Sequence, residues 1–187
     1  MQIQHNNFKA MPSIVLIRHT KVAIEKGICY GQSDIKLANS FEIEKRALQT
    51  KIKPKEFDII YSSPLTRCKT LADALFQNKD IIYDDRLMEL NFGDWEGKHW
   101  DDISKTYQAK IFFKDYVQTA CPGGESYQDL INRVSSFYDE IKLKHSGKHV
   151  AIICHGGSIR AFICAIEGIS PQQAFSRKIA YGQVIKF

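Results

Sequence analysis

The sequence lacks several features that mark particular classes of protein. No stretch approaches the roughly 20 apolar residues of a membrane span, so we expect no membrane partner. Residues 1–12 are polar and contain no apolar signal core, which favours a cytoplasmic protein that begins with a loose tail. The net charge is +5, but Lys and Arg form no dense run, so nucleic acid is not an expected partner.

The patterns of cysteine and histidine exclude further classes. The five cysteines are odd in number and include no Cys-x-x-Cys pair. Cys154 and Cys164 lie in apolar stretches, where a reduced thiol packs as a small hydrophobic group, so we expect free thiols in a reducing compartment. There is no His-x-His or His-Glu-x-x-His motif, and we therefore expect neither a metal nor another cofactor.

The chain does contain alternating strand and helix patterns. Its 187 residues, 44% hydrophobic and 25% charged, suit a single domain, which we place at residues 13–187. The apolar runs predict strands over Ile14–Ile17, Phe57–Tyr61, Ile81–Tyr83, Val150–Cys154 and Gln183–Phe187. Apolar stripes at helical spacing predict helices over Phe41–Leu48, Pro64–Gln77, Ser126–His145 and from Gly157 to Gly168. This alternation predicts a three-layer α/β/α fold with a mixed, mostly parallel central sheet.

Capping residues mark the starts of these helices. Ser40 and Ser63 each precede a predicted helix, and the proline after Ser63 suits a first helical position. Ser126 and Asp129 form the pattern of a capping box. Residues 89–124 are less regular and hold both tryptophans, so this segment could form a cap over a site.

Polar residues follow three of the predicted strands directly. In open α/β sheets, ligands bind outside the carboxyl ends of the strands, so residues at these ends should meet in one crevice. The groups are, in chain order, Arg18-His19-Thr20, Ser62-Ser63 with Arg67, and His155-Gly156-Gly157 with Arg160.

Two of these arginines lie where a cation is locally unfavourable. Arg67 and Arg160 fall in the first turns of their predicted helices, where a positive side chain opposes the helix dipole at a cost of some tenths of a kcal/mol. A bound anion would remove this conflict, because it would accept from the helix N–H groups and from the guanidinium groups together. Phosphate matches this arrangement best, since its oxygens fit the paired donors of arginine.

A histidine among arginines indicates nucleophilic catalysis on phosphorus. A neutral imidazole can attack a phosphoryl group and form a phosphohistidine that water later cleaves. Neighbouring arginines would neutralise the transferring oxygens and would lower the pKa of the histidine, which keeps it unprotonated at neutral pH. The leaving alkoxide then requires a proton donor.

The same residues resemble the motifs of the histidine phosphatase superfamily, also called phosphoglycerate mutase-like. The resemblance runs in the family's order from residue 14 to about residue 160, so chance is an improbable explanation. It is carried by Arg18-His19-Thr20, Ser63–Thr70, Leu87–Gly97, Pro122–Ser126 and His155–Arg160.

The resemblance implies a role for each site residue and a small phosphomonoester as substrate. His19 would be the nucleophile and Glu89 the acid, with Glu25 and Asp94 as alternative acids. No metal would be needed. The phosphoryl group would be held by Arg18, Arg67 and His155, and further phosphate or substrate contacts would come from Gly156, Thr20, Tyr30 and Gln32.

Within the superfamily, residues 29–34 with Leu37 look like the α-ribazole phosphatase branch. That branch removes the 5′-phosphate of α-ribazole phosphate during assembly of the cobalamin nucleotide loop. A broad-specificity sugar-phosphate phosphatase or a phosphoglycerate mutase is the alternative, and a non-catalytic phosphate-binding module is a second. Mutases carry a longer insertion than the segment 96–121, which favours hydrolysis here. Thr20 and Glu25 depart from the residues common in the family and in mutases.

Four aromatic residues, two of them in the irregular segment, allow two interpretations. They could stack on a flat base, or they could pack the cap against the sheet, and the second is the more common role. The sequence gives no prediction of oligomeric state. The residues concerned are Trp95, Trp100, Tyr30 and Tyr127.

Overall fold

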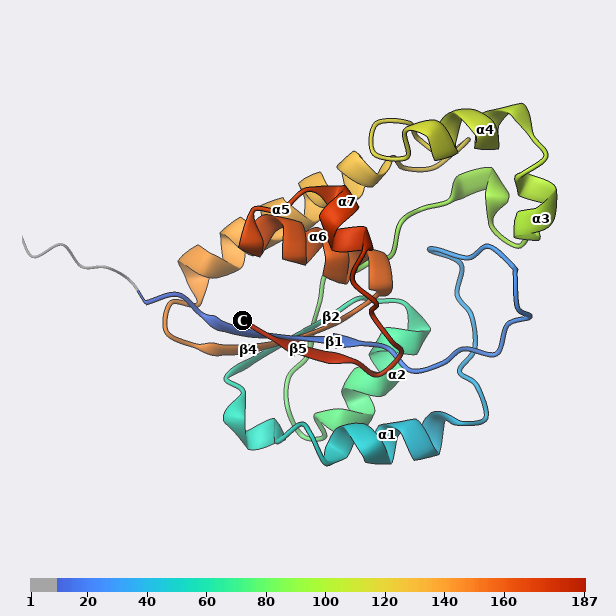
Figure 1. The fold of residues 1–187 in the computed structure, drawn as a ribbon. Helices are drawn as coiled ribbons and strands as arrows, with labels where there is room; N and C mark the ends of the chain where they lie inside the picture. The colour runs from blue at the N-terminus through green and yellow to red at the C-terminus, as the bar shows by residue number, and fades with distance from the viewer. Residues whose placement is uncertain (1–9) are drawn as a thin grey trace, which may run out of the picture.

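A computed structural model describes residues 10–187 and shows a sheet covered by helices on both faces (Figure 1). Strand β1 lies between β4 and β5, and the full order is β3-β2-β4-β1-β5. All neighbouring pairs are parallel except β1 with β5, which confirms the predicted mixed, mostly parallel sheet. The strands are β1 Ser13–Arg18, β2 Ile59–Ser62, β3 Ile82–Tyr83, β4 His149–Cys154 and β5 Val184–Lys186.

The helices form the two outer layers and a separate group at one end. Helices α5, α6 and α7 cover one face of the sheet, and α1 and α2 cover the other (Figure 1). Helices α3 and α4 lie at the end of the molecule toward which β1 runs. The bounds are α1 Phe41–Gln49, α2 Thr66–Leu75, α3 Trp100–Ile103, α4 Tyr107–Lys114, α5 Tyr127–Lys144, α6 Gly156–Glu167 and α7 Pro171–Phe175.

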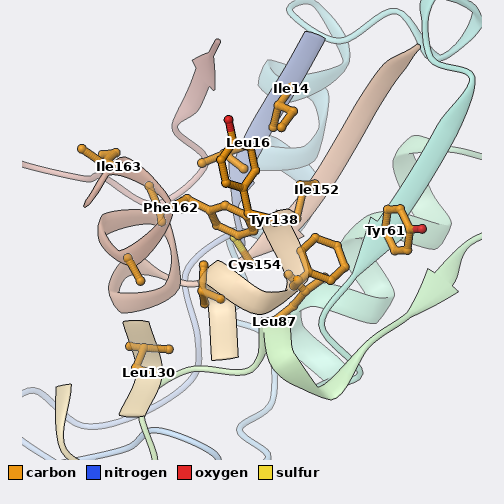
Figure 2. Packing of buried hydrophobic residues seen from close by; sticks show 14 of the residues in the cluster. Ile14, Leu16, Tyr61, Leu87, Leu130, Tyr138, Ile152, Cys154, Phe162 and Ile163 are labelled. Carbon is orange, nitrogen blue, oxygen red and sulfur yellow. The ribbon is translucent and has the colours of Figure 1, made fainter. Parts of the chain in front are cut away.

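The central strands are buried on both faces because their side chains alternate between two cores. In β1, Ile14 and Leu16 join the core under α5 and α6, whereas Val15 and Ile17 join the core over α1 and α2. Figure 2 shows the first of these cores, where Phe162 of α6 packs against the sheet. An unbroken apolar run is therefore what this position in the sheet requires.

Several helix starts differ from the predictions. Helix α2 begins at Thr66, not at Pro64, and Ser63 does not cap it. Leu65 is extended, and the side chain of Asp34 accepts from the Thr66 N–H at 2.9 Å, so a distant loop supplies the cap. Before α1, the Ser40 hydroxyl donates to Glu44 instead of accepting from a helix N–H.

Other boundaries are close to the predicted ones. The capping box of Ser126 and Asp129 opens α5 as predicted. Helix α6 begins at Gly156, one residue earlier than predicted, and ends before Gly168, whose φ of 66° suits glycine. Strand β3 has only two residues, and both are exposed at the sheet edge.

The N-terminal tail is described only in part. Residues 1–9 of the predicted tail lie outside the described residues. The carbonyl of Ala10 accepts from the Gly147 N–H at 2.9 Å and from the Ser146 hydroxyl at 2.8 Å, so residues 10–12 run along the loop after α5. From residue 10 onward, no helix has both the length and the apolar character needed to cross a membrane.

The segment between β3 and α5 forms a small structural unit with its own core. Trp95 is buried there and meets Phe112 of α4 edge-to-face, with the ring centroids 5.1 Å apart. Cys29 and Cys121 are buried in the same cluster. All five cysteines lie in the described range and are free thiols, as predicted. We call residues 89–125 the cap.

Candidate active site

The carboxyl ends of β2, β4 and β1 lie side by side and bring the three predicted polar groups to one edge of the sheet. The sheet hydrogen bonding extends past the strands themselves. The His19 N–H donates to the Cys154 carbonyl at 3.1 Å, and the Ser63 N–H donates to the Ile153 carbonyl at 2.9 Å. The backbone that carries these side chains is therefore as fixed as the sheet.

His19 presents one free ring nitrogen. Its Nδ1 lies 2.7 Å from the Thr20 carbonyl oxygen. A carbonyl can only accept, so Nδ1 carries the proton and Nε2 keeps its lone pair. The side chain is 2% exposed. The neighbouring backbone therefore selects the tautomer that a nucleophilic Nε2 needs.

Burial and charge keep this imidazole neutral. Burial is the largest cause that lowers the pKa of His19 to about 3, and the positive charges of Arg67 and Arg18 add to it. The hydrogen bond to Thr20 acts in the opposite direction without reversing the shift. His19 is therefore unprotonated at neutral pH.

Arg67 is held rigidly although it carries a full charge in a buried place. It is 0% exposed. Its Nη1 donates to the Ser33 carbonyl at 2.9 Å, and its Nη2 donates to the Gly31 carbonyl. Each terminal nitrogen has a second N–H, which leaves donors for an anion.

His155 orients Arg67 and faces the nucleophile. Arg67 Nε can only donate, so at 3.2 Å it fixes His155 Nδ1 as the acceptor. Nε2 then carries the proton and lies 2.8 Å from the Ser63 hydroxyl. The His19 and His155 rings meet edge-on with centroids 5.1 Å apart. Burial, followed by the charge of Arg67, holds the pKa of His155 well below its usual value.

Two buried polar atoms near His19 have no hydrogen-bond partner. Arg18 donates from Nη1 to the Ile179 carbonyl at 2.6 Å, but its buried Nε has no partner, and neither has the buried hydroxyl of Thr20. A Cβ added to Gly156 would lie 3.3 Å from Arg18 Cζ, so this glycine at the start of α6 approaches the guanidinium closely. Buried polar groups are normally hydrogen-bonded, so these unpartnered donors would suit an acceptor such as a phosphate oxygen.

Glu89 lies against the N-terminal turn of α6. Its Oε2 accepts from the Gly157 N–H at 3.0 Å, and its Oε1 accepts from the Leu90 N–H at 3.0 Å. A Cβ on Gly157 would come within 2.1 Å of Oε1, so only glycine allows this approach. The carboxyl group is thereby fixed near the helix end where an anion would bind.

The loop that carries Tyr30 and Gln32, which we predicted to contact substrate, packs against Glu89 and Arg67. The Gln32 side chain donates from Nε2 to the Glu89 carbonyl at 3.1 Å, so it supports the backbone of the acid. The Tyr30 hydroxyl lies 2.7 Å from the Tyr181 hydroxyl, and its ring lies 5.5 Å from Arg67 Cζ. Burial and the bond to Tyr181 raise the pKa of Tyr30.

Sequence reasoning missed Tyr181, which lies in the loop before β5. Its ring stacks on Arg18 at 4.0 Å from Cζ and lies 5.5 Å from the His19 ring. The Gly182 N–H donates to the His19 carbonyl at 3.1 Å. No motif near residue 181 signals this contact.

The sequence also gave no prediction for Arg133 and Glu96, two charged residues that hold the backbone near Glu89. Arg133 of α5 donates to the carbonyls of Met88 and Glu89 at 2.7 and 2.8 Å, and pairs with Glu125 at 2.9 Å. Glu96 accepts from the backbone N–H groups of Gln32 and Ser33. Burial alone would raise the pKa of Glu96, but the hydrogen bond from the Ser33 hydroxyl, together with those from the backbone, outweighs it and lowers the pKa. In the sequence, only the position of Glu96 within the family motif Leu87–Gly97 indicated that it belongs to the site.

Arg160 lies beside the start of α6 but is bound to backbone carbonyls, whereas the two alternative acids are exposed. Arg160 uses Nη1 to bind the Gly156 carbonyl at 3.1 Å and Nη2 to bind the Arg177 carbonyl, one turn deeper in α6 than a first-turn position. Glu25 is exposed, and Asp94 is exposed at a hollow on the cap. Trp95 packs in the core of the cap.

The arrangement can hold a tetrahedral dianion in front of an unprotonated nitrogen. Arg18 and Arg67 act on His19 through their charges, Gly156 at the start of α6 lies beside Arg18, and His19, Thr20 and Arg67 are buried. Among residues 10–187, no group of three His, Cys, Asp or Glu lies together as a metal site requires. The expectation of metal independence stays a prediction.

Comparison with known proteins gives consistent matches along the chain. Residues 14–187 match the histidine phosphatase superfamily (branch 1). The chain is 32% identical to a 2,3-bisphosphoglycerate-dependent phosphoglycerate mutase of Cytophaga hutchinsonii, over 92% of this chain and 85% of the mutase.

Solved structures show the same fold at lower identity. An α-ribazole phosphatase from Shigella flexneri superposes with a TM-score of 0.85 at 21% identity, over 93% of this chain and 89% of that one. A phosphoserine phosphatase from Entamoeba histolytica, solved in complex with 3-phosphoglyceric acid, has a TM-score of 0.82 at 23% identity, over 95% and 90%.

Proposed function

Since the chain belongs to the histidine phosphatase superfamily (branch 1), whose compared members are phosphatases and mutases, we propose that it hydrolyses phosphomonoesters without a metal, through a phosphohistidine at His19. The observation that carries this proposal is the unprotonated Nε2 of His19 beside buried donors that have no partner. Arg18 Nε and the Thr20 hydroxyl are buried there, and both lack a partner. A phosphoryl group would satisfy them.

The first step transfers the phosphoryl group to the enzyme. His19 Nε2 attacks phosphorus, and the bond from phosphorus to the ester oxygen breaks. Arg18 and Arg67 bind the phosphoryl oxygens as charge moves onto them, while His155 keeps Arg67 in place. Glu89, as the carboxylic acid, gives its proton to the leaving alkoxide.

The second step returns the enzyme to its starting state. The Glu89 carboxylate now takes a proton from water, and the hydroxide oxygen attacks phosphorus. The bond from phosphorus to Nε2 breaks and inorganic phosphate leaves. The N–H groups of Gly157 and Leu90 hold the carboxyl group in one orientation through both steps.

A quench experiment tests this mechanism. Enzyme is mixed with ³²P-labelled phosphomonoester and stopped in base, and the peptides are mapped. We expect base-stable, acid-labile label on the peptide that contains His19, and none in His19→Gln. The matched control His149→Gln changes an exposed histidine and should retain the label. Label on a serine, or label that survives in His19→Gln, contradicts the proposal.

We further propose α-ribazole 5′-phosphate as the substrate, so that the reaction contributes to cobalamin nucleotide-loop assembly. The support is the resemblance of residues 29–34 and Leu37 to that branch, and the place of this loop at the site. The carbonyls of Gly31 and Ser33 accept from Arg67, and Gln32 supports the backbone of Glu89. A single domain over residues 13–187 and a cytoplasmic location belong to the same proposal, with free thiols as support for the latter.

A phosphoglycerate mutase is the second candidate, because a mutase is among the relatives at 32% identity. A panel of α-ribazole phosphate, sugar phosphates and 3-phosphoglycerate separates the candidates. We expect release of inorganic phosphate, with the highest kcat/KM for α-ribazole phosphate. Interconversion of 3- and 2-phosphoglycerate, dependent on 2,3-bisphosphoglycerate, favours the mutase. Turnover that disappears with EDTA and returns with a divalent ion contradicts metal independence.

A further inference from the structure

An apolar cavity of about 380 Å³ lies between the cap and α7. Seven of its eight lining residues are aromatic and the eighth is Leu90, so none of the described residues that line it is charged. A volume in this range is typical of a site for a small organic ligand. The residues around His19 are suited to bind the phosphoryl group of a substrate, but they provide no binding surface for its alcohol portion.

The wall of the cavity is joined directly to the residues that hold Glu89. The Leu90 N–H donates to Glu89 Oε1, and the Leu90 side chain lines the cavity. The hydroxyl of Tyr127, another lining residue, donates to the Gly157 carbonyl at 3.2 Å, and the N–H of Gly157 donates to Glu89 Oε2. Two residues of the cavity wall are therefore linked by hydrogen bonds to the groups that hold Glu89, the proposed proton donor.

The opposite wall connects with the start of α6. Phe175 of α7 meets Tyr127 and Tyr116 edge-to-face, with ring centroids 4.8 and 4.9 Å apart. Arg160 lies with Cζ 5.2 Å from the Phe175 ring while its Nη1 binds the Gly156 carbonyl. One arginine thus spans from the anion-binding helix end to the aromatic wall.

The outer rim is aromatic and exposed. Phe113 of α4 is 54% exposed and Phe175 is 42% exposed. Phe113 packs against Trp100 with ring centroids 6.1 Å apart. Large apolar side chains that remain open beside a polar site are suited to the apolar part of a ligand, because covering them removes their surface from water.

We propose that this cavity is the leaving-group subsite, and that it selects phosphomonoesters whose alcohol carries an aromatic ring system a short spacer away from the phosphate. The proposal rests on the proposed phosphatase function and specifies its substrate class. The cavity disfavours alcohols that carry a carboxylate, such as 3-phosphoglycerate, because it offers an anion no cation and no hydrogen-bond donor in exchange for water.

The test uses esters whose leaving alcohols have similar acidity, so that rate differences report binding of the alcohol. We expect kcat/KM for 2-(1-naphthyl)ethyl phosphate to exceed that for ethyl phosphate by at least about 30-fold, and 3-phosphoglycerate to be poorer than ethyl phosphate. Equal kcat/KM for the three esters overturns the subsite and leaves the phosphatase function standing. Failure to hydrolyse any ester or to label His19 overturns both.

Substitutions of cavity residues test whether the preference for the naphthyl ester arises in the cavity. Phe113→Ala should lower the naphthyl-to-ethyl ratio of kcat/KM by about tenfold, mainly through KM, because the contact is made in the ground state and transition state alike. Phe175→Ala should act in the same direction and serves if Phe113→Ala does not fold. The matched control is Tyr107→Ala, an exposed aromatic residue of the same helix that does not line the cavity.

A second copy of the chain is the competing occupant. Sedimentation of the wild type and of Phe113→Ala, across the concentrations used for kinetics, tests it. We expect the same oligomeric state for both. A wild-type dimer that Phe113→Ala dissociates, together with an unchanged naphthyl-to-ethyl ratio, shows that the cavity is an interface between copies and overturns the proposal.

Discussion

The phosphoryl site and the cap are built by different means. At the strand ends, His19, Arg67 and His155 are almost fully buried, and their polar atoms are fixed by backbone carbonyls and by each other. In the cap, aromatic rings pack edge-to-face around Trp95, and Phe113 remains exposed. A site that must bind charge and keep one protonation state requires rigidly held polar neighbours, whereas an apolar surface requires only a complementary shape.

This difference predicts how substitutions in the two regions will affect the protein. Substitutions at the strand ends leave buried polar groups without partners, so they should affect chemistry and stability strongly. Substitutions on the exposed rim of the cap remove contact area only, so they should affect choice of substrate. The four experiments below test this division, from the largest expected effect to the smallest.

Removal of the nucleophile should have the largest effect. We expect His19→Gln to lower kcat for ethyl phosphate by at least about 10⁴-fold, because no other group can form the phosphoenzyme. Steady-state release of phosphate measures this. His149→Gln, at an exposed position, should retain wild-type activity. More than about 1% residual activity in His19→Gln would indicate another nucleophile.

Removal of the acid should have a smaller effect that depends on the leaving group. We expect Glu89→Gln to lower kcat/KM for ethyl phosphate by about 10²- to 10³-fold, and to affect p-nitrophenyl phosphate much less, since nitrophenolate leaves without a proton. The matched control is Asp94→Asn, the exposed carboxylate of the cap that was weighed as an alternative acid. An equal loss for both esters would assign Glu89 to another role.

Acid should destabilise the strand-end region through His19. Its pKa is about 3 in the folded protein and about 6.5 when unfolded, so the unfolded chain binds the proton more readily. The stabilisation is complete above about pH 6.5 and is lost progressively as the pH falls toward 3. We expect it to contribute a loss on the order of 2 kcal/mol in the free energy of unfolding between pH 7.5 and 4.5.

Urea unfolding of the wild type and of His19→Gln at the two pH values measures this contribution. The variant should show a smaller difference between pH 7.5 and 4.5 by the same amount, because glutamine does not titrate. An equal pH dependence in both proteins would show that His19 takes up its proton as readily in the folded state as in the unfolded state.

Truncation at the cap rim should have the smallest effect on stability. We expect Phe113→Ala to change the free energy of unfolding by no more than about 0.5 kcal/mol, because the side chain is more than half exposed. Ile152→Val, which removes one buried methylene from β4, should cost about 1 kcal/mol. A larger loss for Phe113→Ala than for Ile152→Val would mean that the cap and the sheet unfold as one tightly coupled unit.

The sequence was most informative where local patterns decide structure. The alternation of Ile14–Ile17 between two cores and the capping box at Ser126 are local features, and the structure has both. The convergence of three strand ends follows from parallel pairing of β1, β4 and β2, which the alternation of strands and helices implies. The family motifs could be read directly from the residues at those ends.

Prediction from the sequence was wrong or incomplete where a residue's hydrogen-bond or packing partner lies far away in the chain. Ser63 looked like the cap of α2, but Asp34 supplies it from a loop 32 residues earlier. Arg133 and Tyr181 reach the site from α5 and from the loop before β5. Neither residue lies in a motif, and periodicity carries no information on which carbonyl or ring a side chain will meet.

The sequence by itself determined the layered fold and the identity of the residues that meet at the sheet edge, because apolar periodicity and strand-end position are properties of short segments. Only the tertiary structure decided that Thr20 holds the proton of His19 on Nδ1, that Arg67 holds the acceptor nitrogen of His155, and that aromatic rings line an uncharged cavity between the cap and α7. These features depend on the directions of side chains brought together from separate elements, and hydrogen bonding and desolvation act only once the chain has brought them into contact.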